Sequence, residues 1–181
     1  ARRLDPSLEI VALERGHRLH REQVQDTLWP ELDPDAAANN LRGALLVARR
    51  TLESAGAPPG VFLTRDGDTL VLGPLEQIHV DVAAFQAAAS RAWQGGDIAA
   101  VERALAHYAG DLLPDDPYEE WAESRRHGLR ATYLTLLERL AGMQERAGDG
   151  SAALATREQA LAADPLDEAQ HTAIMRLLAH L

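Results

Sequence analysis

Five residues between positions 39 and 50 carry groups that can recognise the edges of DNA bases. Asn39 and Asn40 offer side-chain amides, which pair bidentately with adenine N6 and N7. Arg42 and Arg50 offer guanidinium groups, which pair in the same way with guanine O6 and N7. Gly43 leaves the backbone bare for a close approach. On one helix face this set predicts a base-reading surface, where each bidentate pair discriminates by about 1 to 3 kcal/mol.

The stretch from Asp33 to Glu53 has the signals of a helix that would hold these residues. Asp33 suits the N-cap because its carboxylate accepts backbone N–H groups, and Pro34 suits the first helical position because it lacks an N–H. At about 100° per residue, one narrow arc collects the apolar residues Leu41, Leu45, Ala48 and Leu52. We expect that arc to be buried and the arc of amides and guanidinium groups to be exposed.

A plainer interpretation of the same helix is that its polar face is simply solvated, because Asn and Arg are ordinary exposed residues. The charge of the chain bears on this choice. The formal net charge is -10. Residues 1–74 hold 9 Arg against 11 Asp and Glu, whereas residues 75–181 hold 9 Arg against 17. The first part is therefore close to neutral and can still present a basic side to a polyanion.

Two shorter helices are predicted before this one. Residues 4–15 form a short apolar and polar segment that ends at Gly16. Residues 17–19 are expected to be extended, and a second helix is expected from His20 to Trp29, where Pro30 stops it.

A β-hairpin is predicted after the third helix. Val61–Thr64 and Thr69–Leu72 are β-rich runs on either side of the Asp66-Gly67 pair, which is a strong hairpin signal. The tip of this hairpin presents Arg65. Three helices followed by a hairpin are the elements of a winged helix-turn-helix, whose third helix enters the major groove.

From Val80 onwards the pattern predicts helical hairpins. A long helical span over residues 118–146 is expected to contain a break near Gly128 or Gly142. Over residues 140–165 the small residues follow the 34-residue tetratricopeptide pattern. The expected fold is mainly α, with a winged helix-turn-helix over residues 1–74 and an all-α tetratricopeptide-like domain over residues 80–181. We expect three tryptophans to lie in cores: Trp29, Trp93 and Trp121.

Several segments together resemble the SARP (antibiotic regulatory) family of bacterial transcriptional activators. They read HREQVQDTLWPELDPDAAANNLRGALLVARRTLE, DGDTLVL, DVAAFQAA and GDLLPDDPYEEWAESRR. Members of that family join a winged helix to an all-helical bacterial transcriptional activation domain of tetratricopeptide-like repeats. The resemblance covers essentially the whole chain, although the small β-sheet that precedes the first helix in the family has no counterpart in this sequence.

The resemblance implies a DNA-binding activator that works as a homodimer, binds direct repeats in double-stranded DNA and recruits RNA polymerase to promoters. It implies base contacts from the helix that holds Asn39, Asn40, Arg42, Gly43 and Arg50. It implies contacts to phosphate, or by the wing, from His20, Arg21, Arg49 and Arg65.

Other classes of function make different use of the same residues. The leading alternative is a tetratricopeptide-type scaffold whose winged helix serves dimerisation or partner binding, with Leu46 and Val47 as interface residues. His17 and His20 with Glu22 outline a metal site, but a third ligand at helical spacing is missing, so no metal or other cofactor is expected. No GxxxxGK[ST], GxSxG or GxGxxG motif occurs, and no enzyme is expected. Without Cys or an apolar run near 18 residues, a cytoplasmic location without membrane insertion is expected.

Overall fold

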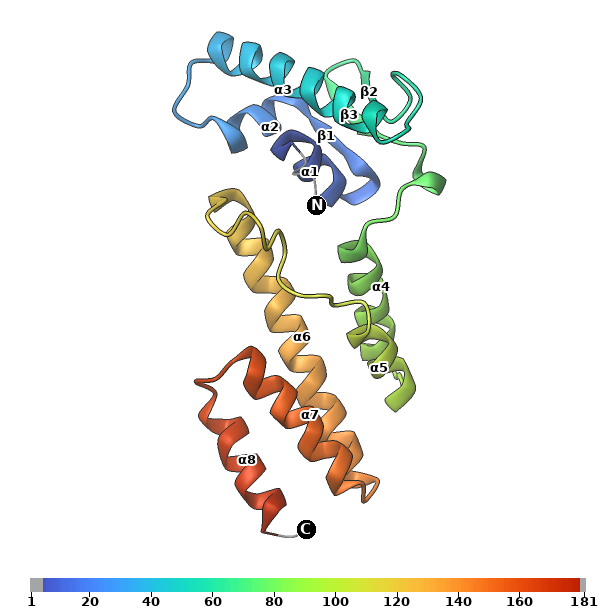
Figure 1. The fold of residues 1–181 in the computed structure, drawn as a ribbon, viewed down its shortest axis with the longest axis vertical. Coiled ribbons are helices and arrows are strands. Elements are labelled where there is room, and N and C mark those ends of the chain that lie inside the picture. Colours follow the sequence, from blue (N-terminus) through green and yellow to red (C-terminus); the bar gives the residue numbers. More distant parts are fainter. Residues whose placement is uncertain (1–4, 180–181) are drawn as a thin grey trace. The chain divides into compact units, whose positions relative to one another are not determined.

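A computed structural model describes residues 5–179 of the chain (Figure 1). The chain separates into two compact units, Ala1–Val80 and Asp81–Leu181. We refer to them as unit 1 and unit 2.

Unit 1 contains the three expected helices, with ends set by their caps. In α1 (Pro6–Leu13) the Asp5 side chain accepts the N–H of Ser7, and in α2 (Arg21–Leu28) His20 is the N-cap. In α3 (Pro34–Ser54) the Asp33 carboxylate accepts the N–H groups of Asp35 and Ala36 at 3.1 and 3.0 Å. The predicted start of the third helix is thus confirmed, because a carboxylate satisfies N–H groups that have no partner within the helix.

Among the described residues of unit 1, three short strands form one antiparallel sheet. β1 (Arg18–His20) pairs with β3 (Thr69–Leu72), and β3 also pairs with β2 (Leu63–Asp66), so the strand order is β1-β3-β2. The predicted hairpin is confirmed, with Gly67 in the left-handed conformation at φ 61°. Strand β1 was missed by the sequence pattern, which predicts only an extended segment there. Its three residues form a strand because they pair with β3, a partner about fifty residues away in the chain.

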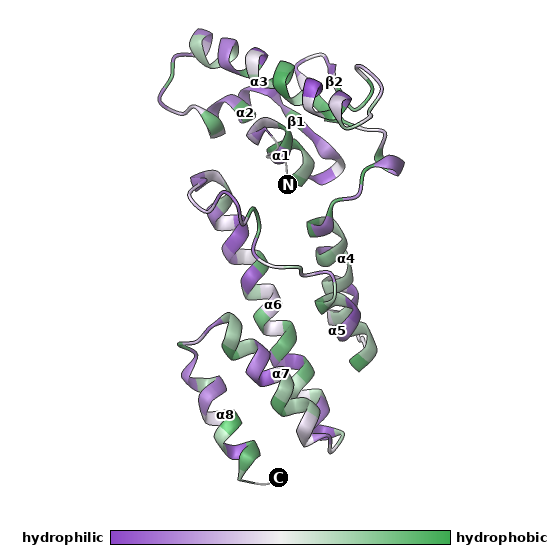
Figure 2. Ribbon diagram, viewed as in Figure 1, coloured by the Kyte–Doolittle hydropathy of each residue, from purple (hydrophilic) through white to green (hydrophobic). Residues whose placement is uncertain are grey.

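The core of unit 1 forms between α3, the other helices and the sheet. Leu41, Leu45 and Ala48 are buried as predicted, and Leu52 is partly buried against the same core. Figure 2 shows hydrophobic and hydrophilic residues alternating along α3, as expected for a helix with one buried side. The residues that complete this core come from both helices and strands: Leu8, Val11, Val24, Leu63, Leu70 and Leu72.

Unit 2 is helical in its described residues. Its elements are α4 (Asp81–Trp93), α5 (Ile98–Leu105), α6 (Glu120–Arg146), α7 (Gly150–Ala163) and α8 (Glu168–Leu178). Figure 1 shows α7 lying along α6 and α8 lying along α7, and the contacts between their residues agree. Buried alanines at the first of these pairings, Ala141, Ala153 and Ala160, let the helices approach closely.

The expected break in the long helix is wrong. Helix α6 runs for 27 residues through Gly128 and Gly142 without interruption. A glycine inside a helix costs about 1 kcal/mol relative to alanine, and burying one leucine side chain contributes about 1.5 to 3 kcal/mol. Because α6 buries Leu129, Leu136, Leu137 and Leu140, packing outweighs the two glycines.

Trp93 lies outside the core, contrary to the expectation. Its side chain is 42% exposed, and the guanidinium carbon of Arg139 lies 5.1 Å from the centre of its ring. Such a cation–π contact suits a tryptophan at the surface. Trp29 is partly buried against the unit 1 core, and Trp121 is half-buried with Nε1 donating to Glu119 Oε2 at 3.0 Å.

Arg126 of α6 binds the backbone of the loop between α5 and α6. The guanidinium of Arg126 donates to the carbonyl oxygens of Leu112, Pro117 and Asp116 at 2.9, 3.2 and 3.2 Å. These three hydrogen bonds satisfy carbonyls of a segment that has no secondary structure to pair them. The acidic, proline-rich turn is therefore ordered by contacts that its own sequence does not show.

Candidate nucleic-acid interface

The five predicted base-reading residues share the exposed side of α3. The following residues are all exposed: Asn39, Asn40, Arg42, Gly43 and Arg50. They are carried by the same helix whose opposite side is fixed in the core by Leu41, Leu45 and Ala48. Because the buried side sets the rotation of the helix, the polar side is presented outward with little freedom to turn.

Two of these residues are hydrogen-bonded to each other. Arg42 Nη1 donates to Asn39 Oδ1 at 2.6 Å, which joins residues three positions apart on the helix surface. The contact orients both side chains. An amide oxygen has two lone pairs, so Asn39 Oδ1 can accept a second hydrogen bond while this one is kept.

Gly43 has no packing reason to be a glycine. A β-carbon built at this position would have no neighbouring described atom within 4 Å, apart from the helix's own nearby backbone. Its φ is not positive either, so an alanine would meet no backbone strain. Since glycine weakens a helix by about 1 kcal/mol relative to alanine, Gly43 costs α3 stability that the packing of unit 1 does not require.

Arg49 differs from the other arginines of α3. It is half-buried, and its Nε donates to the carbonyl oxygen of Leu63 at 3.0 Å. The side chain therefore joins α3 to β2. Arg49 was predicted to bind phosphate, and the structure shows that it also makes this contact within the fold. The sequence pattern gave no sign of the contact.

His20 and Arg21 lie where β1 ends and α2 begins. His20 Nδ1 accepts the N–H of Glu22, and the Gln23 side chain accepts the N–H of His20. Both hydrogen bonds are long, at 3.4 Å, and together they form a capping box between His20 and Gln23 at the start of α2. The backbone N–H of Arg21 donates to the carbonyl oxygen of Asp68 at 2.8 Å. The start of α2 is thereby tied to the turn of the hairpin.

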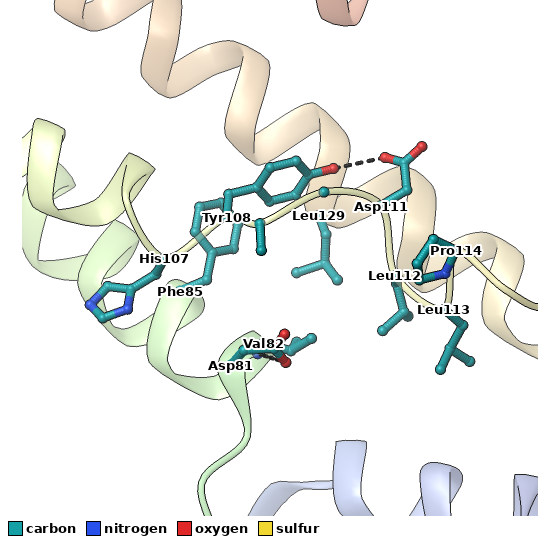
Figure 3. Close-up of a pocket in the computed structure, with 12 residues that line it drawn as sticks. Asp81, Val82, Phe85, His107, Tyr108, Asp111, Leu112, Leu113, Pro114 and Leu129 are labelled. Carbon is teal, nitrogen blue, oxygen red and sulfur yellow. Dashed lines mark hydrogen bonds between the residues drawn. The ribbon is translucent and has the colours of Figure 1, made fainter. Parts of the chain in front are cut away.

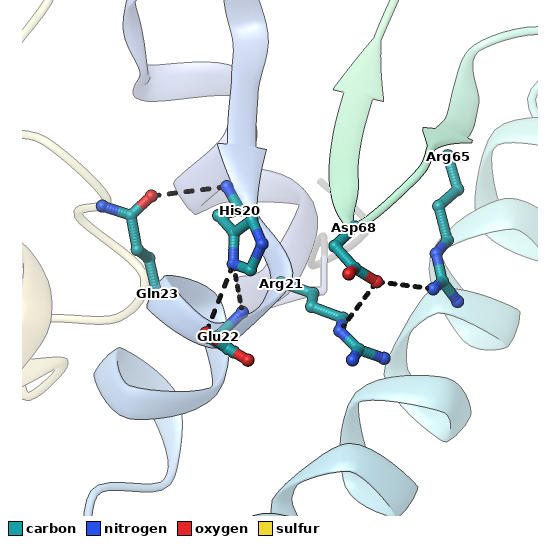
Figure 4. Close-up of polar contacts among 6 residues, drawn as sticks. All are labelled: His20, Arg21, Glu22, Gln23, Arg65 and Asp68. Carbon is teal, nitrogen blue, oxygen red and sulfur yellow. Dashed lines mark hydrogen bonds and ion pairs between the residues drawn. The ribbon is translucent and has the colours of Figure 1, made fainter.

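A carboxylate of the hairpin turn lies between two arginines, as Figure 4 shows. Asp68 Oδ1 accepts a hydrogen bond from Arg65 Nη2 at 2.9 Å and lies 3.1 Å from Arg21 Nε. Arg21 Nε is buried and its N–H makes no well-aligned hydrogen bond, so this second contact is an ion pair. The turn therefore brings together two predicted phosphate-binding residues from different elements.

A neighbouring pair extends this cluster along the sheet. Arg18 Nη2 donates to Asp66 Oδ2 at 2.7 Å, and both side chains are largely exposed. We call Arg18, Arg21, Arg65, Asp66 and Asp68 the wing cluster. Sequence reasoning missed Arg18 and both aspartates. Charged residues of both signs are visible in the hairpin sequence. Their pairing with Arg18 could not be predicted without strand β1.

Unit 2 contains a pocket of about 230 Å³ beside the loop between α5 and α6 (Figure 3). Its wall includes Phe85, Tyr108 and Leu129, and the Tyr108 hydroxyl donates to Asp111 Oδ1 at 2.8 Å. Burial, followed by this hydrogen bond, raises the pKa of Tyr108. The Tyr108 ring also stacks on that of Tyr133, with centroids 4.1 Å apart. The aromatic side chains of this pocket pack on one another and its carboxylate is hydrogen-bonded, so these residues have structural roles.

Within residues 5–179, no three His, Asp or Glu side chains converge as they would around a metal ion. In the same range, no helix has both the length and the apolar character needed to span a bilayer.

Comparison with known proteins identifies the helical part of the chain. Residues 79–181 match the family model described as bacterial transcriptional activator domain. The chain belongs to this family of transcriptional activators. No curated protein matches the chain.

Proposed function

We propose that the protein is a DNA-binding transcriptional activator of SARP type, with unit 1 as a winged helix-turn-helix. One observation carries this proposal: the amides, guanidinium groups and bare glycine predicted to read bases all lie on the exposed side of α3. The match of residues 79–181 to a transcriptional activator domain also supports the proposal, because a transcriptional activator can act through DNA binding. In a winged helix the third helix enters the major groove, where Asn and Arg distinguish adenine from guanine.

The positions of the other arginines support a division of labour. Arg21 and Arg65 lie beside the hairpin turn and belong to α2 and β2, not to α3, so they suit contacts to phosphate. In the proposal they set the register of unit 1 on the duplex, while α3 reads the sequence. Unit 2, as a tetratricopeptide-like domain, provides the contacts for a homodimer on direct repeats and for RNA polymerase in the cytoplasm. No catalytic role is part of the proposal.

The test is a titration of duplex DNA at several salt concentrations. Sites should first be selected from a random duplex library with the full chain, and the enriched sequence then compared with a scrambled one. The enriched site should bind more tightly, and log K should fall with log salt with a slope near -0.9 per phosphate contacted. Arg50→Ala should weaken binding to the enriched site. Arg176→Ala, which removes an exposed arginine from unit 2, is its matched control and should not. Absence of enrichment and of duplex binding would contradict the proposal.

A second candidate function is a protein-interaction scaffold in which α3 contacts a protein. It is favoured by Leu46 and Val47, which are 48% and 54% exposed beside the polar residues of α3. Apolar groups can meet thymine methyl groups in DNA, or they can form the centre of a protein interface. If the protein is a scaffold, replacing Leu46 and Val47 with serine should abolish its self-association. Its binding to duplex DNA should then be absent or independent of salt.

A further inference from the structure

We infer that Asp68 is an internal competitor for the DNA phosphate that Arg21 and Arg65 would bind. The inference rests on the proposed function and deepens it, because it assigns Asp68 control over how strongly this site attracts a polyanion. Carboxylate and phosphate oxygens accept the same guanidinium N–H groups in the same geometry. A carboxylate held between two guanidinium groups therefore occupies the position that a phosphate oxygen would take.

The hydrogen bonds show which donors are engaged. Arg65 uses Nε for the carbonyl oxygen of Gly67 and Nη2 for Asp68. Nε and Nη2 form the edge through which arginine pairs bidentately with an oxyanion. Arg21 Nε lies 3.1 Å from the same carboxylate oxygen in an ion pair. The turn thus occupies this edge of Arg65, and a phosphate oxygen must replace Asp68 to bind at Arg65 Nη2.

The charges lead to the same conclusion. Arg18, Arg21 and Arg65 contribute three positive charges to the wing cluster, while Asp66 and Asp68 contribute two negative ones. Asp68 pairs with two arginines at once, whereas Asp66 pairs with Arg18. Removing the charge of Asp68 should therefore release more positive potential toward DNA than removing that of Asp66.

The backbone around Asp68 allows this charge to be removed without loss of the fold. The Arg21 N–H bonds to the carbonyl oxygen of Asp68, and the Asp68 side chain is half exposed. Asp68→Asn keeps an oxygen acceptor for both arginines but removes the charge. Asp68→Ala removes the acceptor as well, so the pair of variants separates competition from orientation of the arginines. Glu76→Gln makes the same charge change at an exposed site in unit 1.

The experiment measures binding of a random-sequence duplex of about 20 base pairs to the full chain by fluorescence anisotropy. Asp68→Asn and Asp68→Ala should each bind on the order of fivefold more tightly at low salt, the strength of one close charge pair in water. The gain should shrink as salt rises, because the charges are exposed and screened. Glu76→Gln should change binding less than twofold. Weaker binding by Asp68→Ala, or variants that match Glu76→Gln, would overturn the inference.

A second measurement separates this inference from the proposed function. Inorganic phosphate is titrated while the Nε–H signals of Arg21 and Arg65 are followed by NMR. Both signals should respond at lower phosphate concentration in Asp68→Asn than in the unaltered chain. That response without duplex binding by any variant supports the phosphate site and contradicts the DNA-binding function. Duplex binding that Asp68→Asn leaves unchanged, with equal phosphate responses, contradicts the competitor role and leaves the DNA-binding function standing.

Discussion

Arg49 Nε donates a hydrogen bond of 3.0 Å to the carbonyl oxygen of Leu63, and this contact joins α3 to the first strand of the hairpin. The next residue, Arg50, is exposed on the same helix. Two adjacent arginines therefore have different environments. Arg49 contributes to the position of α3, and Arg50 is exposed to solvent.

The first prediction concerns the stability of unit 1. Arg49→Ala should lower the free energy of unfolding by about 1 to 3 kcal/mol, because the Leu63 carbonyl loses a charged donor in a partly buried place. Arg50→Ala should change it by less than about 0.5 kcal/mol, as is usual for an exposed residue. Urea unfolding followed by circular dichroism checks both values. Equal losses for the two variants would show that the contact of Arg49 with Leu63 has no special weight.

The second prediction concerns selectivity. Arg50→Ala should cost about 1 to 3 kcal/mol on the selected site and relax the preference at one base pair. Arg21→Ala should weaken selected and random duplexes by the same factor, because a phosphate contact carries no sequence information. Competition binding with both duplexes measures the two ratios. If Arg21→Ala altered the preference and Arg50→Ala did not, the assigned roles would be reversed.

The third prediction concerns Gly43. Gly43→Ala should stabilise α3 by up to about 1 kcal/mol, since alanine is the better helix former and no described atom obstructs the added β-carbon. The same variant should weaken binding to the selected duplex, because the methyl group would lie between α3 and the DNA. Thermal unfolding and anisotropy measure these opposite effects. Unchanged DNA binding would mean that the glycine does not face the duplex.

The fourth prediction concerns the helical hairpin of α6 and α7. Thr156 Oγ1 donates to Gln144 Oε1 at 2.8 Å, and both residues are buried. Thr156→Val should cost about 1 to 3 kcal/mol, because it leaves a buried amide oxygen without its donor. Adding Gln144→Leu should recover part of the loss. A double-mutant cycle in urea measures the coupling, and strict additivity would contradict a direct interaction between the two side chains.

The fifth prediction concerns stability at high pH. Burial and the hydrogen bond to Asp111 raise the pKa of Tyr108 above its ordinary value near 10. An unfolded chain would release the phenol proton first, so the stability gained from the neutral phenol is complete below pH 10 and is lost as the pH rises above it. Tyr108→Phe should be less stable at neutral pH, and the difference should narrow in alkaline solution. The chain has no Lys to titrate in that range. Unfolding curves from pH 8 to 12 check this.

The agreement between sequence and structure is closest where local signals are strong. The start of α3 follows from Asp33 and Pro34, and its buried side follows from the spacing of Leu41, Leu45 and Ala48. The hairpin follows from the Gly67 turn. Each of these features depends on residues within one or two turns of the chain, so neighbours in sequence are enough to predict it.

The features that the sequence pattern did not predict share a different cause. Strand β1 exists because β3 pairs with it, and α6 continues through Gly128 because its leucines are buried by other helices. Trp93 stays exposed although its chemistry favours a core position. In each case the deciding partner lies far away in the sequence, and a local pattern contains no information about it.

The sequence by itself therefore determined that one helix carries the amides and guanidinium groups together, and which side of that helix is buried. Tertiary structure alone decided that Arg49 contacts the sheet while Arg50 faces outward, and that Asp68 lies between Arg21 and Arg65. The physical reason is that helix periodicity and capping act over a few residues, whereas an ion pair depends on where the fold places two distant side chains.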